Sequence, residues 1–220
     1  MSVVEAKICG IRTPEVLEAA AEHGARWAGF VFYPPSPRSV GPDEGAQLVQ
    51  RVPMGLLRVG LFVDPTDEEL ESVLNRMPLD MIQLHGAETP QRVAAIRARC
   101  ATSVMKAIKI ATIEDLAAVP NYADVSDWLL FDAKPAKSAT ALPGGNGLAF
   151  DWSMLSGRSW PKPWMLAGGL TEANVAEAVA RTGATTVDVS SGIEERPGYK
   201  TPERVQRFLA AVRAAGSVVE

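Results

Sequence analysis

Two side chains that can move protons stand at the ends of apolar runs that are far apart in the sequence. Cys9 closes the run Glu5–Cys9, and Asp132 closes the run Asp127–Asp132. A cysteine serves as a base only as a thiolate, and its reference pKa is about 8.5, so a nearby positive charge has to lower it. Lys7 is a candidate for that charge and for a substrate contact, because residues two apart lie on the same side of a strand. The alternative for Cys9 is a small apolar residue that only fills space.

The position of Asp132 suits a general acid. Such an acid needs desolvation or a neighbouring anion to raise its pKa from about 3.9. The alternative is that Asp132 only caps the turn after the run. If the two runs are strands on different sides of a closed barrel, Cys9 and Asp132 flank a small molecule bound between them. A base and an acid on opposite walls are what a proton-shifting sugar isomerase requires.

Glycines and serines after later apolar runs have the composition of a phosphate-binding site. Glycines allow backbone N–H groups to approach an anion, and serine hydroxyls add donors. In a barrel of alternating strands and helices, the loops after the seventh and eighth strands commonly bind phosphate. Ordinary glycine turns are the alternative. The residues assigned to phosphate binding are Gly145, Gly147, Gly168, Gly169, Ser190, Ser191 and Gly192.

Four more polar residues are candidates for substrate contacts. Arg38 lies in a segment stiffened by prolines at 34, 35 and 37, and a planar guanidinium matches a carboxylate bidentately. A solvated surface arginine is its alternative. Gln83 and His85 end an apolar run, where His85 either lines the pocket or is a hydrogen-bonded residue at the strand end. Asp188 either binds a sugar hydroxyl or orients the turn at Ser190–Gly192.

Short apolar runs alternate along the chain with longer amphipathic segments. Strict alternation of strand and helix implies parallel strands with right-handed crossovers. About eight such units in 220 residues predict one α/β domain over residues 1–220, a (β/α)8 TIM barrel. An open doubly wound sheet is the alternative, although it usually has fewer strands at this length. The expected strands are Glu5–Cys9, Trp27–Phe32, Leu57–Val63, Met81–Leu84, Val104–Ile110, Asp127–Asp132, Trp164–Ala167 and Thr185–Val189. The expected helices are Pro14–His23, Pro42–Arg51, Thr66–Arg76, Thr89–Arg99, Ile113–Val119, Asp151–Leu155, Thr171–Arg181 and Thr201–Ala215.

Several expected helices begin with a threonine followed by a proline, as at Thr13, Thr89 and Thr201. The threonine supplies an acceptor for the first turn, and the proline presets φ. Gly24 predicts the end of the first helix. The segment Ala133–Ala149, rich in small residues, glycine and proline, predicts a long functional loop.

Composition limits the partners. The net charge is −4 with scattered Lys and Arg, so no basic face for nucleic acid is expected, although local dipoles still allow a small anionic substrate. Cys9 and Cys100 are far apart and form no CxxC pattern, which argues against a disulfide framework or a metal site. The N-terminus has no signal pattern, and no apolar run approaches the roughly 20 residues of a membrane helix. We therefore expect a cytoplasmic protein without membrane contact.

Taken together and in order, these motifs resemble those of the phosphoribosylanthranilate isomerase family. The resemblance covers essentially the whole chain. The double glycine is shared by many phosphate-binding barrels, whereas the combination of Lys7–Gly10, Gln83–Gly86 and Asp188–Gly192 is highly specific. One departure is Asn146, where the family usually has Ser or Thr; asparagine still donates hydrogen bonds. The matching segments are Lys7–Ile11, Gly29–Phe32, Ser36–Arg38, Gly60–Asp64, Gln83–Gly86, Leu130–Asp132, Phe150–Trp152, Leu166–Leu170 and Val187–Glu194.

The resemblance implies a barrel that converts N-(5-phosphoribosyl)anthranilate to 1-(2-carboxyphenylamino)-1-deoxyribulose 5-phosphate, an Amadori rearrangement in tryptophan biosynthesis. It implies that Cys9 is the general base, that Asp132 is the general acid, and that Arg38 holds the anthranilate carboxylate. The glycine loops with Ser190–Gly192 would then hold the phosphate. The substrate's own amine serves as electron sink, so the resemblance implies neither metal nor organic cofactor. A monomer and a homodimer both fit.

The sequence leaves other functions as alternatives to the isomerase. An epimerase of the same barrel type would need metal-ligating histidines at several strand ends, whereas the chain has only His23 and His85. Indole-glycerol-phosphate synthase would need a catalytic lysine and glutamate pair and a longer N-terminal extension. A histidine-pathway isomerase would have an aspartate in place of Cys9. A non-catalytic phosphate-binding barrel would need neither Cys9 nor Asp132.

Overall fold

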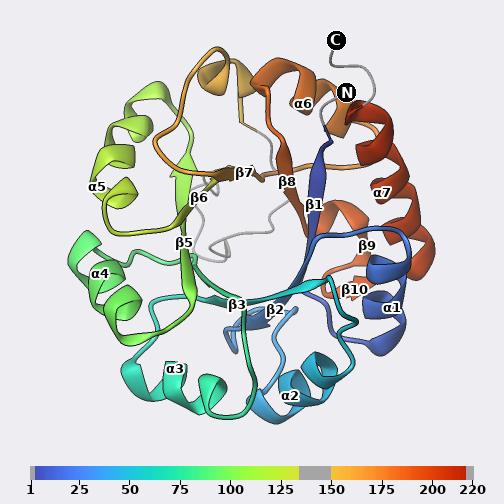
Figure 1. Ribbon diagram of the computed structural model, residues 1–220. Helices are drawn as coiled ribbons and strands as arrows, with labels where there is room; N and C mark the ends of the chain where they lie inside the picture. The colour runs from blue at the N-terminus through green and yellow to red at the C-terminus, as the bar shows by residue number, and fades with distance from the viewer. Residues whose placement is uncertain (1–2, 134–149, 217–220) are drawn as a thin grey trace.

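A computed structural model describes residues 3–133 and 150–216 of the chain. Within them, eight parallel strands close into a barrel, and the last strand pairs with the first. Figure 1 shows the helices as an outer ring around these strands. The predicted (β/α)8 barrel is confirmed, and the open-sheet alternative is wrong because no edge strand is left unpaired in the closed ring. The strands are β1 (Glu5–Cys9), β2 (Trp27–Phe32), β3 (Leu57–Phe62), β4 (Met81–Leu84), β5 (Ser103–Ile110), β6 (Trp128–Ala133), β7 (Trp164–Leu166) and β8 (Thr186–Val189).

The helices begin close to where the sequence places them. The side chains of Thr13, Thr66 and Thr89 each accept a hydrogen bond from a backbone N–H in the first turn of the helix that follows. Gly24 has a φ of 86°, the left-handed conformation expected just after the first helix. The helical segments are α1 (Pro14–Glu22), α2 (Pro42–Gln50), α3 (Asp67–Leu74), α4 (Pro90–Arg99), η1 (Ile113–Ala118), α5 (Val119–Ala123), η2 (Trp152–Leu155), α6 (Val175–Thr182) and α7 (Pro202–Gly216).

Three expected helices are shorter or tighter than the sequence indicates. The segment Ile113–Val119 is largely the 3-10 turn η1, which leads into α5. After β6, the segment Asp151–Leu155 forms only the 3-10 turn η2. Helix α6 begins at Val175 rather than Thr171, because the Asn174 side chain accepts from the Thr171 N–H and closes a turn before the helix. Short segments gain too few hydrogen bonds and contacts to sustain a regular α-helix.

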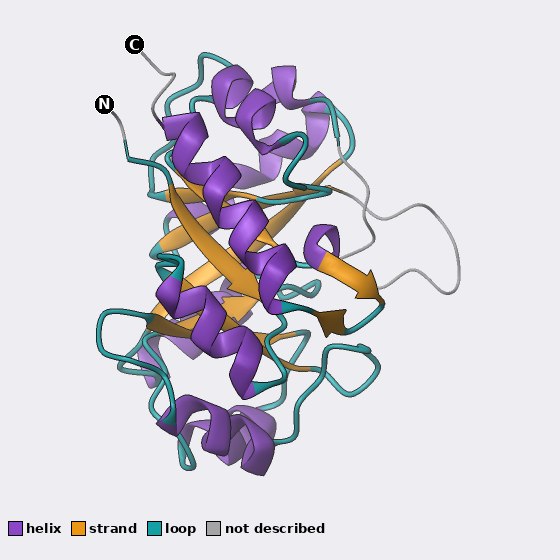
Figure 2. Ribbon diagram, turned by 90° about the vertical axis from the view of Figure 1, so that its right-hand side faces the viewer, coloured by secondary structure: helices purple, strands orange, loops and turns teal. Residues whose placement is uncertain are grey.

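The sequence does not predict a small antiparallel hairpin that follows β8. It consists of β9 (Glu194–Arg196) and β10 (Tyr199–Lys200), preceded by the turn η3 (Ser191–Ile193). Figure 2 shows the hairpin at one end of the barrel. Gly198 has a φ of 81°, and a Cβ there would lie 2.2 Å from the carbonyl oxygen of Pro37, so a glycine lets the hairpin pack on the loop after β2. Such short, charged strands lack the apolar alternation by which strands are predicted.

Alternate residues of the strands fill the inside of the barrel with apolar side chains. The opposite faces of the strands pack against the helices in a separate, larger core. Because the interior is packed, polar side chains have room only at the end of the barrel beyond this layer. The interior residues are Trp27, Val59, Met81, Met105, Ala107, Leu130, Met165 and Ala167.

A buried ion pair ties β5 to the loop after β4 outside this interior. The Lys106 Nζ donates to Glu88 Oε2 at 2.6 Å and to the Gly86 carbonyl at 2.9 Å. Glu88 Oε1 accepts from the backbone N–H groups of Asp64 and Gly86. Although burial alone would raise the pKa of Glu88, the charge of Lys106 and these hydrogen bonds hold it below its usual value. The carboxylate therefore joins three segments of the barrel wall.

Glu88→Gln should destabilise the fold by about 3–5 kcal/mol, since it leaves the buried Lys106 ammonium without its counter-charge. The free energy of unfolding in urea would measure this loss. Because the pKa of Glu88 is depressed in the folded state, its contribution is present at neutral pH and is lost as the pH falls through that lowered value. Glu177→Gln removes an exposed pair with Arg181 and is the matched control, with an expected change within about 0.5 kcal/mol. Equal losses in the two variants would contradict the prediction.

Candidate active site

Polar side chains from β1, β4, β6 and β8 meet at the C-terminal end of the barrel. Alternation along each strand turns these residues inward, beyond the apolar interior. The structure brings together six of the predicted site residues, all of them buried: Lys7, Cys9, Gln83, His85, Asp132 and Asp188. Of the other predicted residues, Gly145 and Gly147 lie outside the described residues, together with most of the expected loop Ala133–Ala149.

Cys9 and Lys7 are neighbours on the inner face of β1. A Cβ placed on Gly29 would lie 3.1 Å from Lys7 Cε and 3.2 Å from Cys9 Sγ, so both side chains meet over this glycine of β2. The Lys7 Nζ donates to Asp188 Oδ1 at 2.9 Å, across the β1–β8 pairing. Burial raises the pKa of the Cys9 thiol more than the charge of Lys7 lowers it, and Asp188 raises it further. Lys7 thus shares its charge between a thiol and a carboxylate.

On the opposite wall, a chain of hydrogen bonds orients Asp132. The Gln83 Nε2 lies 2.8 Å from His85 Nδ1, and His85 Nε2 lies 3.0 Å from Asp132 Oδ2. Asp132 Oδ1 accepts from the Ala133 N–H at 2.9 Å. When the amide donates to Nδ1, a neutral His85 carries its proton on Nε2 and donates it to Asp132. His85 is therefore a hydrogen-bonded residue at the strand end that also positions the candidate acid.

Arg38 is buried, so its reading as a solvated surface arginine is wrong. Its Nε and Nη2 donate to the two carboxylate oxygens of Glu194, each at 2.8 Å. The sequence predicts that the guanidinium binds a carboxylate, and in the structure that carboxylate is the side chain of Glu194, at the start of β9. Gly10 makes room for this arrangement, because a Cβ there would lie 3.0 Å from Arg38 Cδ. Any carboxylate that binds to Arg38 would share the guanidinium with Glu194.

The predicted phosphate loops lie side by side after β7 and β8, which are neighbours in the barrel. Gly168 and Gly169 have φ values of 88° and 64°, in the left-handed region that favours glycine. Gly192 packs directly on the loop after β7, since a Cβ there would lie 1.8 Å from the Leu170 carbonyl oxygen. Ser190 Oγ donates to the Cys9 carbonyl at 3.1 Å, so one predicted phosphate donor already links this loop to β1.

Sequence reasoning missed three charged residues of this site. Glu194 and Lys200 form an ion pair of 2.8 Å in the unpredicted hairpin, and both side chains are buried. Lys109 is half-buried and is the Cα partner of Asp132 in the β5–β6 register. Burial and the charge of Lys106 lower the pKa of Lys109. The only signal in the sequence is that these residues lie close to recognised motifs, because the sequence around a single charged residue does not show that it is buried.

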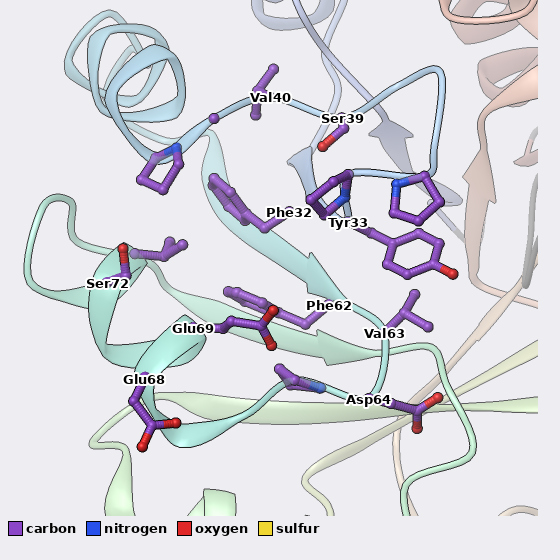
Figure 3. A pocket seen from close by; sticks show the side chains of 16 residues that line it. Phe32, Tyr33, Ser39, Val40, Phe62, Val63, Asp64, Glu68, Glu69 and Ser72 are labelled. Atoms are coloured by element: carbon purple, nitrogen blue, oxygen red, sulfur yellow. The ribbon is translucent and has the colours of Figure 1, made fainter.

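A separate pocket opens between α2 and α3, at the ends of β2 and β3 (Figure 3). Phe32 and Phe62 stack at its base, with ring centroids 5.3 Å apart. Asp64, Glu68 and Glu69 line it as well, and none of the predicted site residues does. Acidic side chains repel an anionic substrate, which favours the inner mouth of the barrel as the substrate site.

The described part of the chain shows neither a metal-ligand cluster nor a helix fit to span a membrane. In residues 3–133 and 150–216, no group of three or more His, Cys, Asp and Glu residues could hold a metal ion. No helix in this part of the chain is both long and apolar enough to cross a membrane.

The fold and the site define the class of the protein: a TIM-barrel enzyme with buried ionisable side chains and glycine-rich loops at the C-terminal end of its strands. Comparisons with known proteins narrow this class. The model of the family "N-(5'phosphoribosyl)anthranilate (PRA) isomerase" matches residues 6–211. The N-(5'-phosphoribosyl)anthranilate isomerase of Rhodospirillum centenum is 57% identical over 211 residues, which cover 96% of this chain and 99% of the relative. That of Paracoccus denitrificans is 55% identical over 96% of this chain and 98% of the relative.

Two solved structures similar to this chain come from the same family. Phosphoribosyl anthranilate isomerase from Thermotoga maritima has a TM-score of 0.86 at 32% identity, covering 96% of this chain and all of that one. A phosphoribosyl anthranilate isomerase solved in complex with reduced 1-(o-carboxyphenylamino)-1-deoxyribulose 5-phosphate has a TM-score of 0.80 at 30% identity, with 96% and 100% covered. The chain belongs to the N-(5'-phosphoribosyl)anthranilate isomerase family, as its motifs predicted.

Proposed function

We propose that this chain converts N-(5-phosphoribosyl)anthranilate to 1-(2-carboxyphenylamino)-1-deoxyribulose 5-phosphate, a step of tryptophan biosynthesis, with Cys9 as general base and Asp132 as general acid. The observation that carries the proposal is the buried thiol of β1 facing a site whose other wall, on β6, holds a buried carboxyl group. Membership of the isomerase family supplies the reaction. A related enzyme binds the reduced form of the same product, which supports the substrate class.

The reaction begins with two proton transfers, one to the ring oxygen and one from C2′. Asp132 donates a proton to the furanose ring oxygen, the bond from this oxygen to C1′ breaks, and the nitrogen lone pair forms an iminium. The Cys9 thiolate then removes the C2′ proton, which the iminium has made acidic, and an enolamine forms. Tautomerisation of the enolamine, with a proton added at C1′ and lost from the C2′ hydroxyl, gives the aminoketose. The substrate nitrogen takes up and returns the electron pair throughout.

The remaining predicted residues serve to place the sugar between acid and base. The loops with Gly168, Gly169 and Ser190–Gly192 hold the phosphate, and Arg38 contributes to binding the anthranilate carboxylate while it stays paired with Glu194. Holding both ends of the substrate fixes C2′ near Cys9, and such positioning can supply much of the rate enhancement.

The fluorescence decay of freshly generated N-(5-phosphoribosyl)anthranilate, followed with purified protein and a chelator present, tests this function. We expect decay far faster than in the protein-free control. No acceleration by folded wild-type protein would overturn the isomerase function and leave a non-catalytic phosphate-binding barrel. Inhibition by the chelator would show that a metal takes part.

Gly192→Ala should weaken binding of the phosphorylated substrate. An added Cβ forces the loop after β8 away from Leu170 and displaces its donors. Loss of one hydrogen bond to a charged group costs about 1.5–3 kcal/mol, so we expect Kd for the reduced product analogue to rise about tenfold or more, measured by calorimetry. Gly157→Ala is the control, because a Cβ on Gly157 meets nothing within 4 Å; Gly157 has a positive φ, 66°, unlike Gly192, so the control also covers backbone strain. An unchanged Kd in Gly192→Ala would remove this loop from the phosphate site.

A further inference from the structure

Lys109 lies on the inner face of β5, at the mouth of the barrel and next to the candidate acid. Met105 and Ala107, on the same face of this strand, fill the interior together with Leu130, the Cα partner of Ala107 on β6. The next pair of this kind toward the mouth is Lys109 and Asp132. Because residues two apart lie on the same face of a strand, Lys109 points into the site beside Asp132.

The ammonium of Lys109 differs from the other cations of the site in lacking a close partner among the described residues. Within this part of the chain, its Nζ makes neither a hydrogen bond nor an ion pair, although the side chain is half-buried. Two other lysines of the mouth each hold a carboxylate, Lys7 that of Asp188 and Lys200 that of Glu194. Burying a charge without a partner is unfavourable, so an anion bound beside Lys109 gains from its charge.

The acidic groups near Lys109 leave this charge available. Burial, followed by the charge of Lys106, lowers the pKa of Lys109. Three carboxyl groups raise it, those of Asp132, Glu88 and Asp64. Glu88 is already paired with Lys106 at 2.6 Å, and Asp132 is protonated, and so uncharged, when it acts as the general acid. A further anion that reaches Lys109 therefore competes little with these groups.

The covalent structure of the substrate indicates which of its anions comes to this position. The ring oxygen of the sugar lies between C1′, which carries the anthranilate, and C4′, which carries the phosphate arm. When Asp132 on β6 meets the ring oxygen and the loops after β7 and β8 hold the phosphate, the anthranilate extends to the other side of Asp132, toward β5. Its carboxylate is ortho to the amine nitrogen and thus stays close to C1′. The anion on the side of Lys109 is the carboxylate.

We propose that Lys109 binds the anthranilate carboxylate of the substrate through an ion pair that forms when the substrate enters the site. This inference rests on the proposed function, because it names a contact to the substrate of that function. Arg38, predicted for the same carboxylate, already donates to both carboxylate oxygens of Glu194. With Lys109 as a second cation, the site selects a sugar phosphate whose aromatic amine carries an ortho carboxylate.

Two reduced product analogues test this contact without turnover. One is reduced 1-(2-carboxyphenylamino)-1-deoxyribulose 5-phosphate, and the other is the same compound made from aniline, which lacks the carboxylate. Calorimetry gives the Kd of each analogue for wild type, Lys109→Met and Lys109→Arg. Lys109→Met should raise Kd for the carboxylated analogue by about tenfold or more, as expected for loss of a charged hydrogen bond, and should leave Kd for the other analogue unchanged. Lys109→Arg keeps the charge and should lose less affinity.

Lys162→Met is the matched control for the loss of one positive charge. Lys162 is also half-buried, but it precedes β7 and therefore lies at the opposite end of the barrel. Its replacement should leave both Kd values unchanged. Circular dichroism shows whether each variant is folded, and Lys109→Gln, which is also uncharged, takes the place of Lys109→Met if that variant is not folded.

An unchanged preference for the carboxylated analogue in folded Lys109→Met would overturn the proposal and leave the carboxylate to Arg38. An equal loss for both analogues would also overturn it, because Lys109 would then act on the sugar or the phosphate. A lower kcat with unchanged Kd values would overturn it as well and assign Lys109 to Asp132. Failure of the proposed function looks different: wild type would bind the analogues without accelerating the fluorescence decay, and the two Kd values would still test the contact of Lys109.

Discussion

Cys9→Ser should lower kcat/KM for N-(5-phosphoribosyl)anthranilate by about 10³-fold, in the middle of the range of roughly 10²–10⁴ for a positioned general base. Serine is close to cysteine in size, but its hydroxyl does not ionise near neutral pH, so the C2′ proton has no acceptor. Cys9 packs with Val31 and Leu61 in a small cluster separate from the main core, and the fold should persist. The fluorescence decay measures turnover, and Kd for the reduced product analogue should stay close to the wild-type value.

The matched control is Cys100→Ser. Cys100 ends α4, far from the mouth, and its replacement should leave kcat/KM unchanged. The pH dependence gives a second readout. Burial raises the pKa of the Cys9 thiol, so the thiolate fraction and with it kcat/KM should rise as the pH increases through neutrality. Turnover by Cys9→Ser within about tenfold of wild type would contradict the role of the thiol as base, since a lost base costs at least about 10²-fold.

The barrel could be predicted because each unit carries its own signals. Runs such as Trp27–Phe32 and Met81–Leu84 are bounded by turn residues, and the structure begins and ends these strands at the same residues. Thr13 and Thr89 mark helix starts through a side-chain oxygen that acts within one turn. Where a segment depends on distant contacts instead, as α6 does on the turn closed by Asn174, its start could not be read from local sequence.

The sequence predicts which residues belong to the site, but not how they contact one another. Strand ends identify Cys9 and Asp132, because every strand end of a barrel faces one mouth. The pairing of residues could not be predicted. Arg38 and Glu194 lie 156 positions apart, and nothing in either segment shows that the guanidinium holds this carboxylate. Lys200 lies in a two-residue strand whose formation depends on Gly198 fitting against Pro37.

The two walls of the site are built on different principles. On the β1 side, charged groups surround the thiol: Lys7 with Asp188, and Lys200 with Glu194. On the β6 side, the imidazole of His85, itself held by the amide of Gln83, bonds the Asp132 carboxyl group, and the half-buried Lys109 is the Cα partner of Asp132. Two ion pairs therefore lie on the side of the thiol, whereas the carboxyl group has one imidazole partner and one nearby cation. The hydrogen bond from His85 fixes the direction in which the carboxyl group faces the site.

Asp132→Asn should lower kcat/KM by about 10²–10³-fold, the effect of a lost general acid. Asparagine has no proton to give to the ring oxygen, but its Oδ1 can still accept from the Ala133 N–H. The space around the Asp132 side chain is small, because a Cβ on Gly168 would lie 3.2 Å from Asp132 Oδ1. Asparagine has the same shape as aspartate and therefore tests the proton without disturbing the packing. Asp124→Asn, on the exposed end of α5, is the control and should have no effect.

The double variant Cys9→Ser/Asp132→Asn shows whether the two residues act in successive steps. If ring opening by Asp132 precedes proton removal by Cys9, each substitution raises a different barrier, and the higher barrier alone limits kcat/KM. The double variant should then be about as slow as the slower single variant, because catalytic effects of residues that serve one sequence do not multiply. A multiplicative loss would mean that both residues act in one transition state, and an undiminished rate in Asp132→Asn would place the acid elsewhere at the mouth.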